Sequence, residues 1–157
     1  MPSRKIDTFD VAILRILQND SKLPHHEIGE LVNLSAASVQ RRIRRMENDG
    51  IISAVVSIVD PDQVGLSVTM VVEIELASES KEKNNDIKNV FLQTPEIQQC
   101  YYVAGAIDFI LIVIVQNMRE YEELADRVFL SNKNINKFRT FVALDRVKTS
   151  HLSLIHI

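Results

Sequence analysis

Residues 35–50 read SAASVQRRIRRMENDG, and this stretch decides how the first part of the chain is organised. Four of the five residues at positions 41–45 are arginine. On a helical wheel of about 100° per residue, Val39, Ile43 and Met46 fall on one side, and Arg42 lies near that side. The outer side and its flanks carry Ala37, Ser38, Gln40, Arg41, Arg44, Arg45 and Asn48. The stretch therefore predicts an amphipathic helix with a basic outer face.

The ends of this helix are marked as well. Ser35 is a good N-cap, and Leu34 before it can pack on Val39. Gly50 can adopt the left-handed conformation that closes a helix. Pro24 suits the entrance of a preceding helix. The apolar side of that helix consists of Ile28, Leu31 and Val32. Because only a short break separates the two patterns, the sequence predicts a helix-turn-helix.

A third helical pattern precedes this pair. Asp7 is the expected N-cap, and Asp10 lies in the first turn, where the helix dipole favours a negative charge. The apolar side consists of Ile6, Ile13, Leu14 and Leu17. The polar residues 19–21 end the pattern, so the first segment contains three short helices.

The arginine cluster is the one dense group of positive charge in the sequence. The net charge is −3, and residues 1–60 hold eight basic and eight acidic residues, which cancel. A local basic face on a chain that is not basic overall indicates a docking surface for a polyanion. A merely solvated face is the simpler alternative, but neighbouring arginines repel one another without a polyanion. A nuclear-localisation run is a further alternative, which the interleaved core residues disfavour.

The segment after Gly50 is rich in β-prone residues. Residues 51–59 read IISAVVSIV, which predicts a wing or a connecting strand, and Pro61 follows in a turn. The expected domain boundary lies here, with a DNA-binding domain at residues 1–60 and a second domain at residues 61–157.

The second domain alternates strands and helices. Strands are expected at residues 68–76, 97–104, 108–115 and 135–144, and helices at 81–92 and 118–129. The order βαββαβ is the ferredoxin-like arrangement. The predicted fold class is α+β, with an N-terminal winged helix-turn-helix and a C-terminal ferredoxin-like domain.

The strand at 108–115 predicts self-association. Its core, FILIVIV at 109–115, has no polar alternation, as is typical of a strand buried on both faces. Both helices of this arrangement cover one face of the sheet. A second copy of the domain is the simplest cover for the other face.

Other sequence features exclude several classes of protein. No apolar run approaches the roughly 20 residues that span a membrane, and no signal peptide is visible. The single Cys100 is expected as a small buried residue in a reducing cytoplasm. His25 and His26 could face phosphate or solvent, and His151 and His156 lie in a tail without metal-ligand spacing. We expect no metal, no cofactor and, without a nucleophile–base pair, no enzyme activity.

A set of residues spread along the chain carries a family resemblance. In the first part they are Ile6, Asp7, Asp10, Ile13, Leu14, Glu27, Ile28, Leu31, Leu34, Ser35, Val39, Arg42, Ile43, Met46, Glu47, Gly50 and Ile51. In the second part they are 105–109, which read GAIDF, 139–142, which read RTFV, and Val147 with Lys148. In this order and at this length, the chain resembles the Lrp/AsnC family, the leucine-responsive or feast/famine transcription regulators.

The resemblance implies a function and a set of partners. Such proteins bind DNA as dimers that often assemble into octamers, and small effectors, usually amino acids, bind between dimers. Carried over by position, the effector residues would be Tyr102, Gly105, Ala106, Asp108, Met118, Phe141, Val142 and Ala143. The sequence departs from the family at Ala104, where Thr or Ser is common. The loop at 103–109, VAGAIDF, could offer backbone N–H groups to the carboxylate of an amino acid and Asp108 to its ammonium.

The expected DNA-binding residues lie on the third helix. They are Ser35, Ala37, Ser38, Gln40, Arg41, Arg44 and Arg45. Ser38, Gln40 and Arg41 are expected to read bases, and Arg44 and Arg45 to contact phosphates, on double-stranded DNA with inverted-repeat half-sites. An effector-independent architectural protein that wraps DNA is the main alternative, and an enzyme or a stand-alone amino-acid-binding module are others.

Overall fold

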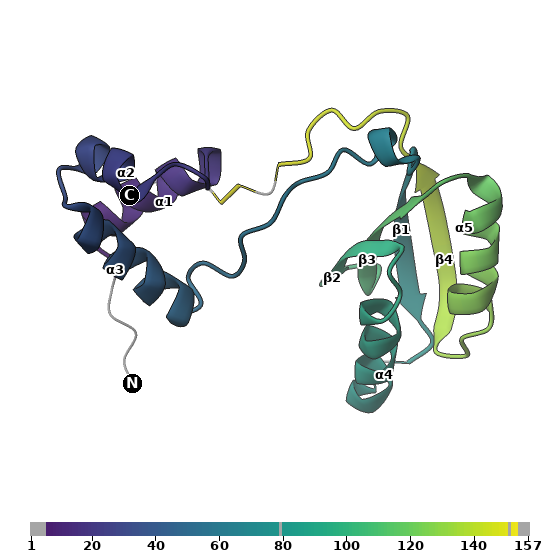
Figure 1. Ribbon diagram of the computed structural model, residues 1–157. Helices are drawn as coiled ribbons and strands as arrows, with labels where there is room; N and C mark the ends of the chain where they lie inside the picture. Colours follow the sequence, from purple (N-terminus) through teal and green to yellow (C-terminus); the bar gives the residue numbers. More distant parts are fainter. Residues whose placement is uncertain (1–5, 79, 151, 154–157) are drawn as a thin grey trace. The chain divides into compact units, whose positions relative to one another are not determined.

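A computed structural model describes residues 6–78, 80–150 and 152–153 of the chain. The chain divides into two compact units (Figure 1). One unit holds the first three helices and the described C-terminal residues, and the other spans Val59–Thr149. The two units are described in turn.

Three helices form the first unit, α1 (Thr8–Asn19), α2 (His25–Val32) and α3 (Ala36–Asn48). Each predicted helix is confirmed, because apolar residues at helical spacing from all three meet in one core. That core consists of Ile13, Leu14, Ile28, Val32, Val39, Ile43 and Met46. Two residues expected on apolar faces lie outside it. Leu31 is 65 % exposed and Ile6 is 37 % exposed, so the expected placement of both was wrong.

The chain reversals of this unit depend on local backbone chemistry. Asn33 ends α2 in the left-handed conformation, with φ of 56°. The Oγ of Ser35 accepts a hydrogen bond from the backbone N–H of Ser38 at 3.2 Å, which confirms Ser35 as the N-cap of α3. Gly50, with φ of 71°, follows the end of α3 in the left-handed conformation, as expected.

The segment after α3 differs from the expectation. Residues 51–59, where a wing or connecting strand was expected, form no helix or strand within the described chain, so that prediction is wrong for the single chain. Their apolar side chains have no strand beside them to pack on. Val55, Val56, Ile58 and Val59 are between 60 % and 72 % exposed.

The second unit is a four-stranded antiparallel sheet in the order β2-β3-β1-β4. The strands are β1 (Val68–Leu76), β2 (Ile97–Tyr102), β3 (Phe109–Val115) and β4 (Ile135–Val142), after a short 3₁₀ turn η1 (Asp62–Val64). The helices are α4 (Lys81–Leu92) and α5 (Met118–Leu124), which continues as a π-helical segment η2 (Ala125–Leu130). The ferredoxin-like prediction is confirmed, although β2 and β4 end two residues earlier than expected.

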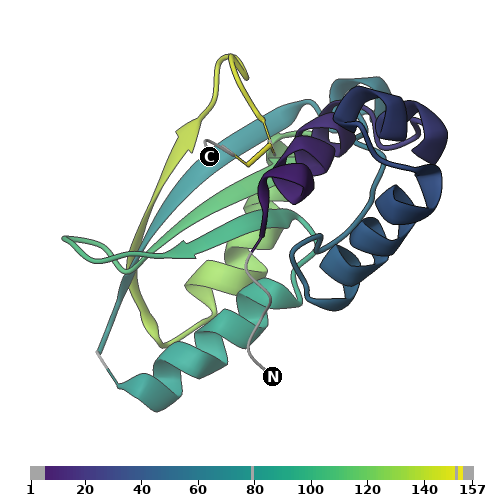
Figure 2. The same cartoon turned by 90° about the vertical axis from the view of Figure 1, so that its left-hand side faces the viewer.

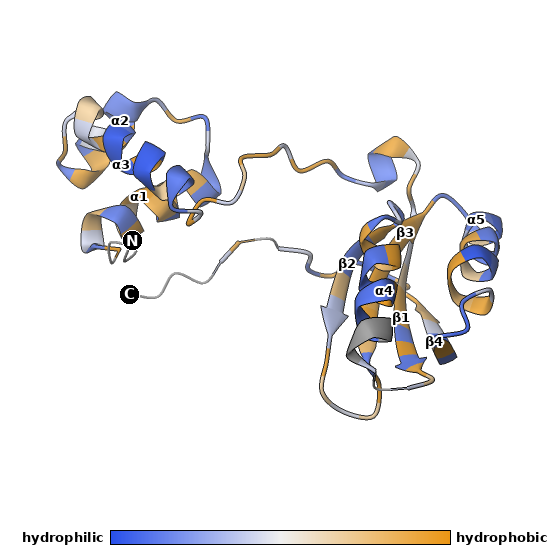
Figure 3. Cartoon of the chain, turned by 90° about the horizontal axis from the view of Figure 1, so that it is seen from below, coloured by the Kyte–Doolittle hydropathy of each residue, from blue (hydrophilic) through white to orange (hydrophobic). Residues whose placement is uncertain are grey.

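Both helices of this unit cover one face of the sheet (Figure 2). Alternate residues of β3 are buried beneath them, from Phe109 to Val115. The intervening Ile110, Ile112 and Ile114 are only half-buried on the other face. Figure 3 shows that β3 is hydrophobic throughout, so the part of the open face that β3 forms is apolar. On the same face, β1 and β4 carry the charged pairs Glu73–Arg139 and Glu75–Lys137.

The described C-terminal residues pair with α1. The backbone of Ser153 exchanges two hydrogen bonds with the side-chain amide of Gln18, at 2.6 Å and 3.3 Å.

Cys100 is exposed on β2, so the expectation of a buried thiol was wrong.

Candidate nucleic-acid interface and effector region

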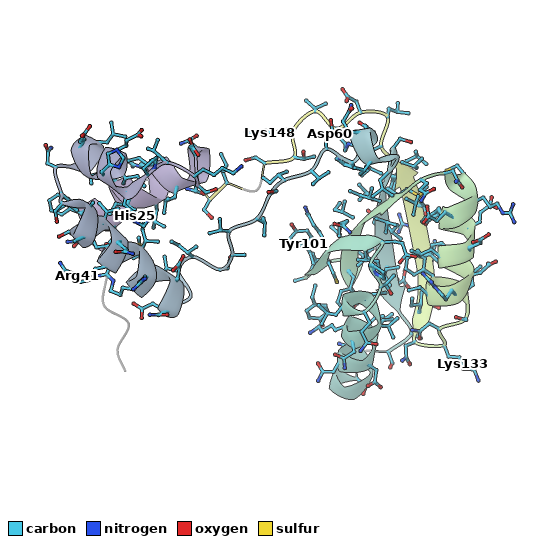
Figure 4. All side chains as sticks on the ribbon, viewed as in Figure 1. His25, Arg41, Asp60, Tyr101, Lys133 and Lys148 are labelled. Atoms are coloured by element: carbon cyan, nitrogen blue, oxygen red, sulfur yellow. The ribbon has the colours of Figure 1, made fainter. Side chains whose placement is uncertain are left out.

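The outer side of α3 presents a basic surface. Ala37, Gln40, Arg41 and Arg44 are exposed, opposite the buried Val39, Ile43 and Met46. Arg41 projects from this outer side, as its label in Figure 4 shows. A shallow depression runs along it, lined by Ala37, Gln40, Arg41, Arg44, Arg45, Asn48 and Asp49. The structure thus brings most of the predicted DNA-binding residues onto one surface, with Ser35 and the half-buried Ser38 at its N-terminal end.

The arginine cluster is divided between two environments. Arg42 donates to Asp7 at 2.7 Å and to Asp10 at 2.8 Å, and its guanidinium lies 5.4 Å from the ring centre of Phe9. Arg45 donates to the second carboxylate oxygen of Asp10. The expected phosphate contact of Arg45 stays a prediction, but these contacts weigh against it.

Asp10 is the centre of this group, and sequence reasoning assigned it only to the helix dipole. Its side chain is fully buried, and its backbone N–H donates to Asp7 while the N–H of Asp7 donates back at 3.1 Å. Burial opposes ionisation of Asp10, but the hydrogen bonds from Asp7, Arg42 and Arg45 outweigh it and lower its pKa. The hydrogen bond from Arg42 lowers the pKa of Asp7. Both carboxylates are thus held in the charged form.

The residues assigned to the effector region fall into two groups. One group lies where β2 turns into β3. Tyr102 is 55 % exposed, with the ammonium of Lys88 at 4.5 Å from its ring centre and the side-chain amide of Asn84 donating to its hydroxyl at 3.3 Å. Gly105 has φ of 155°, and Ala106 is exposed beside it. Asp108 completes the turn.

The other group lies at the opposite end of the strands. Phe141 and Val142 pair with Val71 and Met70 at the start of β1, whereas the turn at 103–108 adjoins its end. Met70 and Leu76 are six residue steps apart along β1, which is roughly 20 Å along a strand. Met118 lies at the same end as Phe141 and Val142, because it follows Val115, which pairs with Val68 at the start of β1. The structure therefore does not bring the two groups together within one chain.

Asp108 has a structural contact in this fold. Its carboxylate accepts from the backbone N–H of Leu76 at 2.7 Å, and its own N–H donates to the carbonyl of Ile74 at 2.8 Å. It therefore joins the hairpin to the end of β1. A carboxylate has further acceptor capacity, so this contact leaves room for a ligand ammonium.

Other candidate chemistry is sparse in the described part of the chain. No group of three or more His, Cys, Asp or Glu side chains there could hold a metal ion. His25 and His26 are exposed at the start of α2, and His151 and His156 lie outside the described residues. Among the described helices, none has the length and apolar composition needed to cross a bilayer.

Comparison with known proteins covers both units. Residues 6–47 match the AsnC-type helix-turn-helix domain, and residues 69–152 match the Lrp/AsnC ligand binding domain. An HTH-type transcriptional regulator of Sinorhizobium fredii, y4tD, is 41 % identical over 146 residues, covering 93 % of this chain and 86 % of the relative. The glutamate uptake regulatory protein of Zymomonas mobilis is 33 % identical, covering 94 % of this chain and 89 % of the relative.

A solved structure agrees with these matches. The crystal structure of an AsnC family transcriptional regulator from Agrobacterium tumefaciens superposes with a TM-score of 0.90 at 32 % identity, covering 96 % of this chain and 97 % of that one. The matched domains and relatives are regulators rather than enzymes, in agreement with the expectation from the sequence. This chain is a transcriptional regulator with a ligand-binding domain, and it belongs to the Lrp/AsnC family.

Proposed function

We propose that this regulator binds specific sites on double-stranded DNA through the outer face of α3. The observation that carries the proposal is the exposed pair Arg41 and Arg44, beside Gln40 and Ser38, on a helix whose opposite side is buried. A helix docked in the major groove reads bases with its N-terminal half and contacts the backbone with later basic residues. The small Ser35 and Ala37 allow close approach of the helix start. The protein would act in the cytoplasm, where its DNA lies.

Two substitutions test how the face is used. Arg41→Ala should relax preference at one base position, because a bidentate arginine–guanine pair contributes about 1–3 kcal/mol of discrimination. Arg44→Ala should weaken all sequences alike and reduce the slope of log affinity against log salt by about 0.9 per lost phosphate contact. Fluorescence anisotropy with a selected site and a random duplex, each over a salt series, measures both. Equal losses on both duplexes for both variants would contradict the base-reading role. The same titrations give the specificity ratio, which would be near one for an architectural protein.

We further propose that an amino acid is the effector and that a second copy completes its site. The family match to a ligand binding domain supports a ligand, and the name of the Zymomonas mobilis relative links that protein to glutamate uptake. The two groups of effector residues lie at opposite ends of one sheet, so a site that uses both groups needs two chains. In this site Asp108 would bind the ammonium of the ligand, and the N–H groups of the turn would bind its carboxylate.

A thermal-shift screen against the twenty amino acids tests the effector. A ligand at about 100 times its Kd adds roughly 2.7 kcal/mol of stability, which shifts the melting temperature measurably. Asp108→Asn keeps an acceptor for the N–H of Leu76 but removes the charge, so it should abolish the shift while DNA binding without ligand stays near wild type. Asp86→Asn, an exposed change on α4, is the matched control. If no amino acid moves the melting temperature or the oligomer distribution of the wild type, the effector proposal fails.

A further inference from the structure

The arginine cluster on α3 carries less free charge than its sequence suggests. Arg41 and Arg44 are exposed on the outer face. Arg42 and Arg45 are turned toward α1, with side chains only 21 % and 26 % exposed. Both inner arginines bind one carboxylate, that of Asp10.

The inner group is electrically neutral. Asp7 and Asp10 carry two negative charges, and Arg42 and Arg45 carry two positive charges. Phosphate affinity depends on positive charges that can approach the DNA and release its counterions. An arginine paired to a buried carboxylate has its charge neutralised, so the inner pair adds little to that attraction.

The inner pair is also costly to release. Asp10 is fully buried and accepts from three groups, namely Arg42, Arg45 and the backbone N–H of Asp7. If both arginines turned to the DNA, this carboxylate would stay buried with one backbone donor. Removing the partners of a buried charge is strongly unfavourable, whereas a surface contact to phosphate is replaced by water at little cost.

We propose that Asp10 is a positioning residue that withholds Arg42 and Arg45 from the DNA backbone and so limits sequence-independent binding. The inference rests on the proposed role of α3 in DNA binding. Non-specific affinity comes from phosphate contacts, while discrimination comes from base contacts. Keeping two of four adjacent arginines off the backbone therefore favours the specific site over random DNA.

A purely structural ion pair makes a different prediction. If Asp10 only holds α1 against α3, its loss lowers the affinity for every duplex along with the stability. If Asp10 also withholds the arginines, its loss releases positive charge onto the DNA side. The dependence of binding on salt separates these cases, because the slope counts phosphate contacts and not stability.

The experiment measures the affinity of the full chain for a random duplex and for a selected site over a salt series. Asp10→Asn keeps the shape of the side chain and removes its charge. We expect its salt slope to steepen by about 0.9 for each arginine released per bound α3, with a larger gain in affinity for the random duplex than for the selected site. The double variant Asp10→Asn/Arg45→Met should return part of the way to the wild-type slope. A folded Asp10→Asn protein with an unchanged or shallower slope would overturn the proposal.

Arg45→Met decides the matter if Asp10→Asn does not fold. It leaves Asp10 bound to Arg42 and to the N–H of Asp7, and it should keep the wild-type salt slope. Arg44→Met, the matched loss of an outer arginine, should reduce the slope by about 0.9. If Arg45→Met reduces the slope as much as Arg44→Met, then Arg45 contacts phosphate and the withholding idea is wrong. If Arg41→Met and Arg44→Met both leave the slope unchanged, the proposed DNA face itself fails, which is a separate result.

Discussion

At the scale of single residues, the lowered pKa values of Asp7 and Asp10 predict that the free energy of unfolding decreases at acid pH. Hydrogen bonds, led by that from Arg42, lower the pKa of Asp7, and those on Asp10 outweigh its burial, so both folded pKa values lie below the ordinary 3.8. As the pH falls, the unfolded chain therefore binds protons first. The contribution of the pair is complete above about pH 5 and is lost as the pH falls through 3.8 toward the lower folded values.

Unfolding in urea, followed by circular dichroism at pH values from neutral to about 3, measures this effect. Arg42→Met removes the main cause of the low pKa of Asp7, so its stability should change less than that of the wild type between pH 5 and pH 3. If the free energy of unfolding of Arg42→Met falls as steeply with pH as that of the wild type, other carboxylates cause the loss of stability in acid.

The sequence predicted the exposed arginines but not the role of Asp10. Helical spacing places Arg41 and Arg44 outward from local information alone. The pairing of Asp10 with Arg42 and Arg45 joins residues more than thirty positions apart, so it depends on how α1 docks on α3. A carboxylate in a first turn usually serves the helix dipole, and that local explanation concealed the tertiary one.

At the scale of elements, the α2–α3 turn depends on a close backbone approach. A Cβ added at Gly29 would lie 2.4 Å from the carbonyl oxygen of Leu34, a backbone atom that cannot turn away. Gly29→Ala should therefore cost about 1–3 kcal/mol of stability through overpacking. The exposed neighbour Glu30→Ala should stay within about 0.5 kcal/mol of wild type. Urea unfolding of both variants measures the difference, and a gain in stability for Gly29→Ala, as helix propensity alone would give, would contradict the close approach.

Most elements of the second unit followed from the sequence. Alternation marked β1, and Pro95 marked the region between α4 and β2. The failures have physical causes. Residues 53–60 are β-prone, but a strand needs a neighbour for its backbone groups, and the single chain offers none there. The π-helical turn at Ala125–Leu130 was expected as ordinary helix; its Ala125, Val128 and Phe129 pack in the core of the second unit.

At the scale of the whole molecule, the open face of the sheet and the two separated groups of proposed effector residues both favour association with a second copy of the chain. Val71, Ile110, Ile112 and Ile114 leave an apolar surface half-exposed on the face opposite α4 and α5. The residues proposed for the effector site lie at the two ends of the sheet, so they would need a second chain to meet. The run FILIVIV predicted a second copy over the open face of the sheet. It could not predict the arrangement of the copies, because that depends on how the folded surfaces of two chains fit together.

Self-association through this face is testable in the full chain. Ile112 lies between Val71 of β1 and Gln99 of β2 and is half-buried, outside the core under the helices. Ile112→Lys should therefore leave each chain folded but reduce its mass in light scattering toward that of a monomer, because an unpaired charge would be buried between copies. Leu92→Lys, a change of the same chemistry at a site that is 79 % exposed on α4, should leave the mass unchanged. If Ile112→Lys keeps the wild-type mass with its fold intact, the copies associate through another surface.

The same variant should also bind DNA differently. The affinity of Ile112→Lys for an inverted repeat should fall more than its affinity for a single half-site, because only the associated form presents two α3 helices at half-sites about one helical turn, or a multiple, apart.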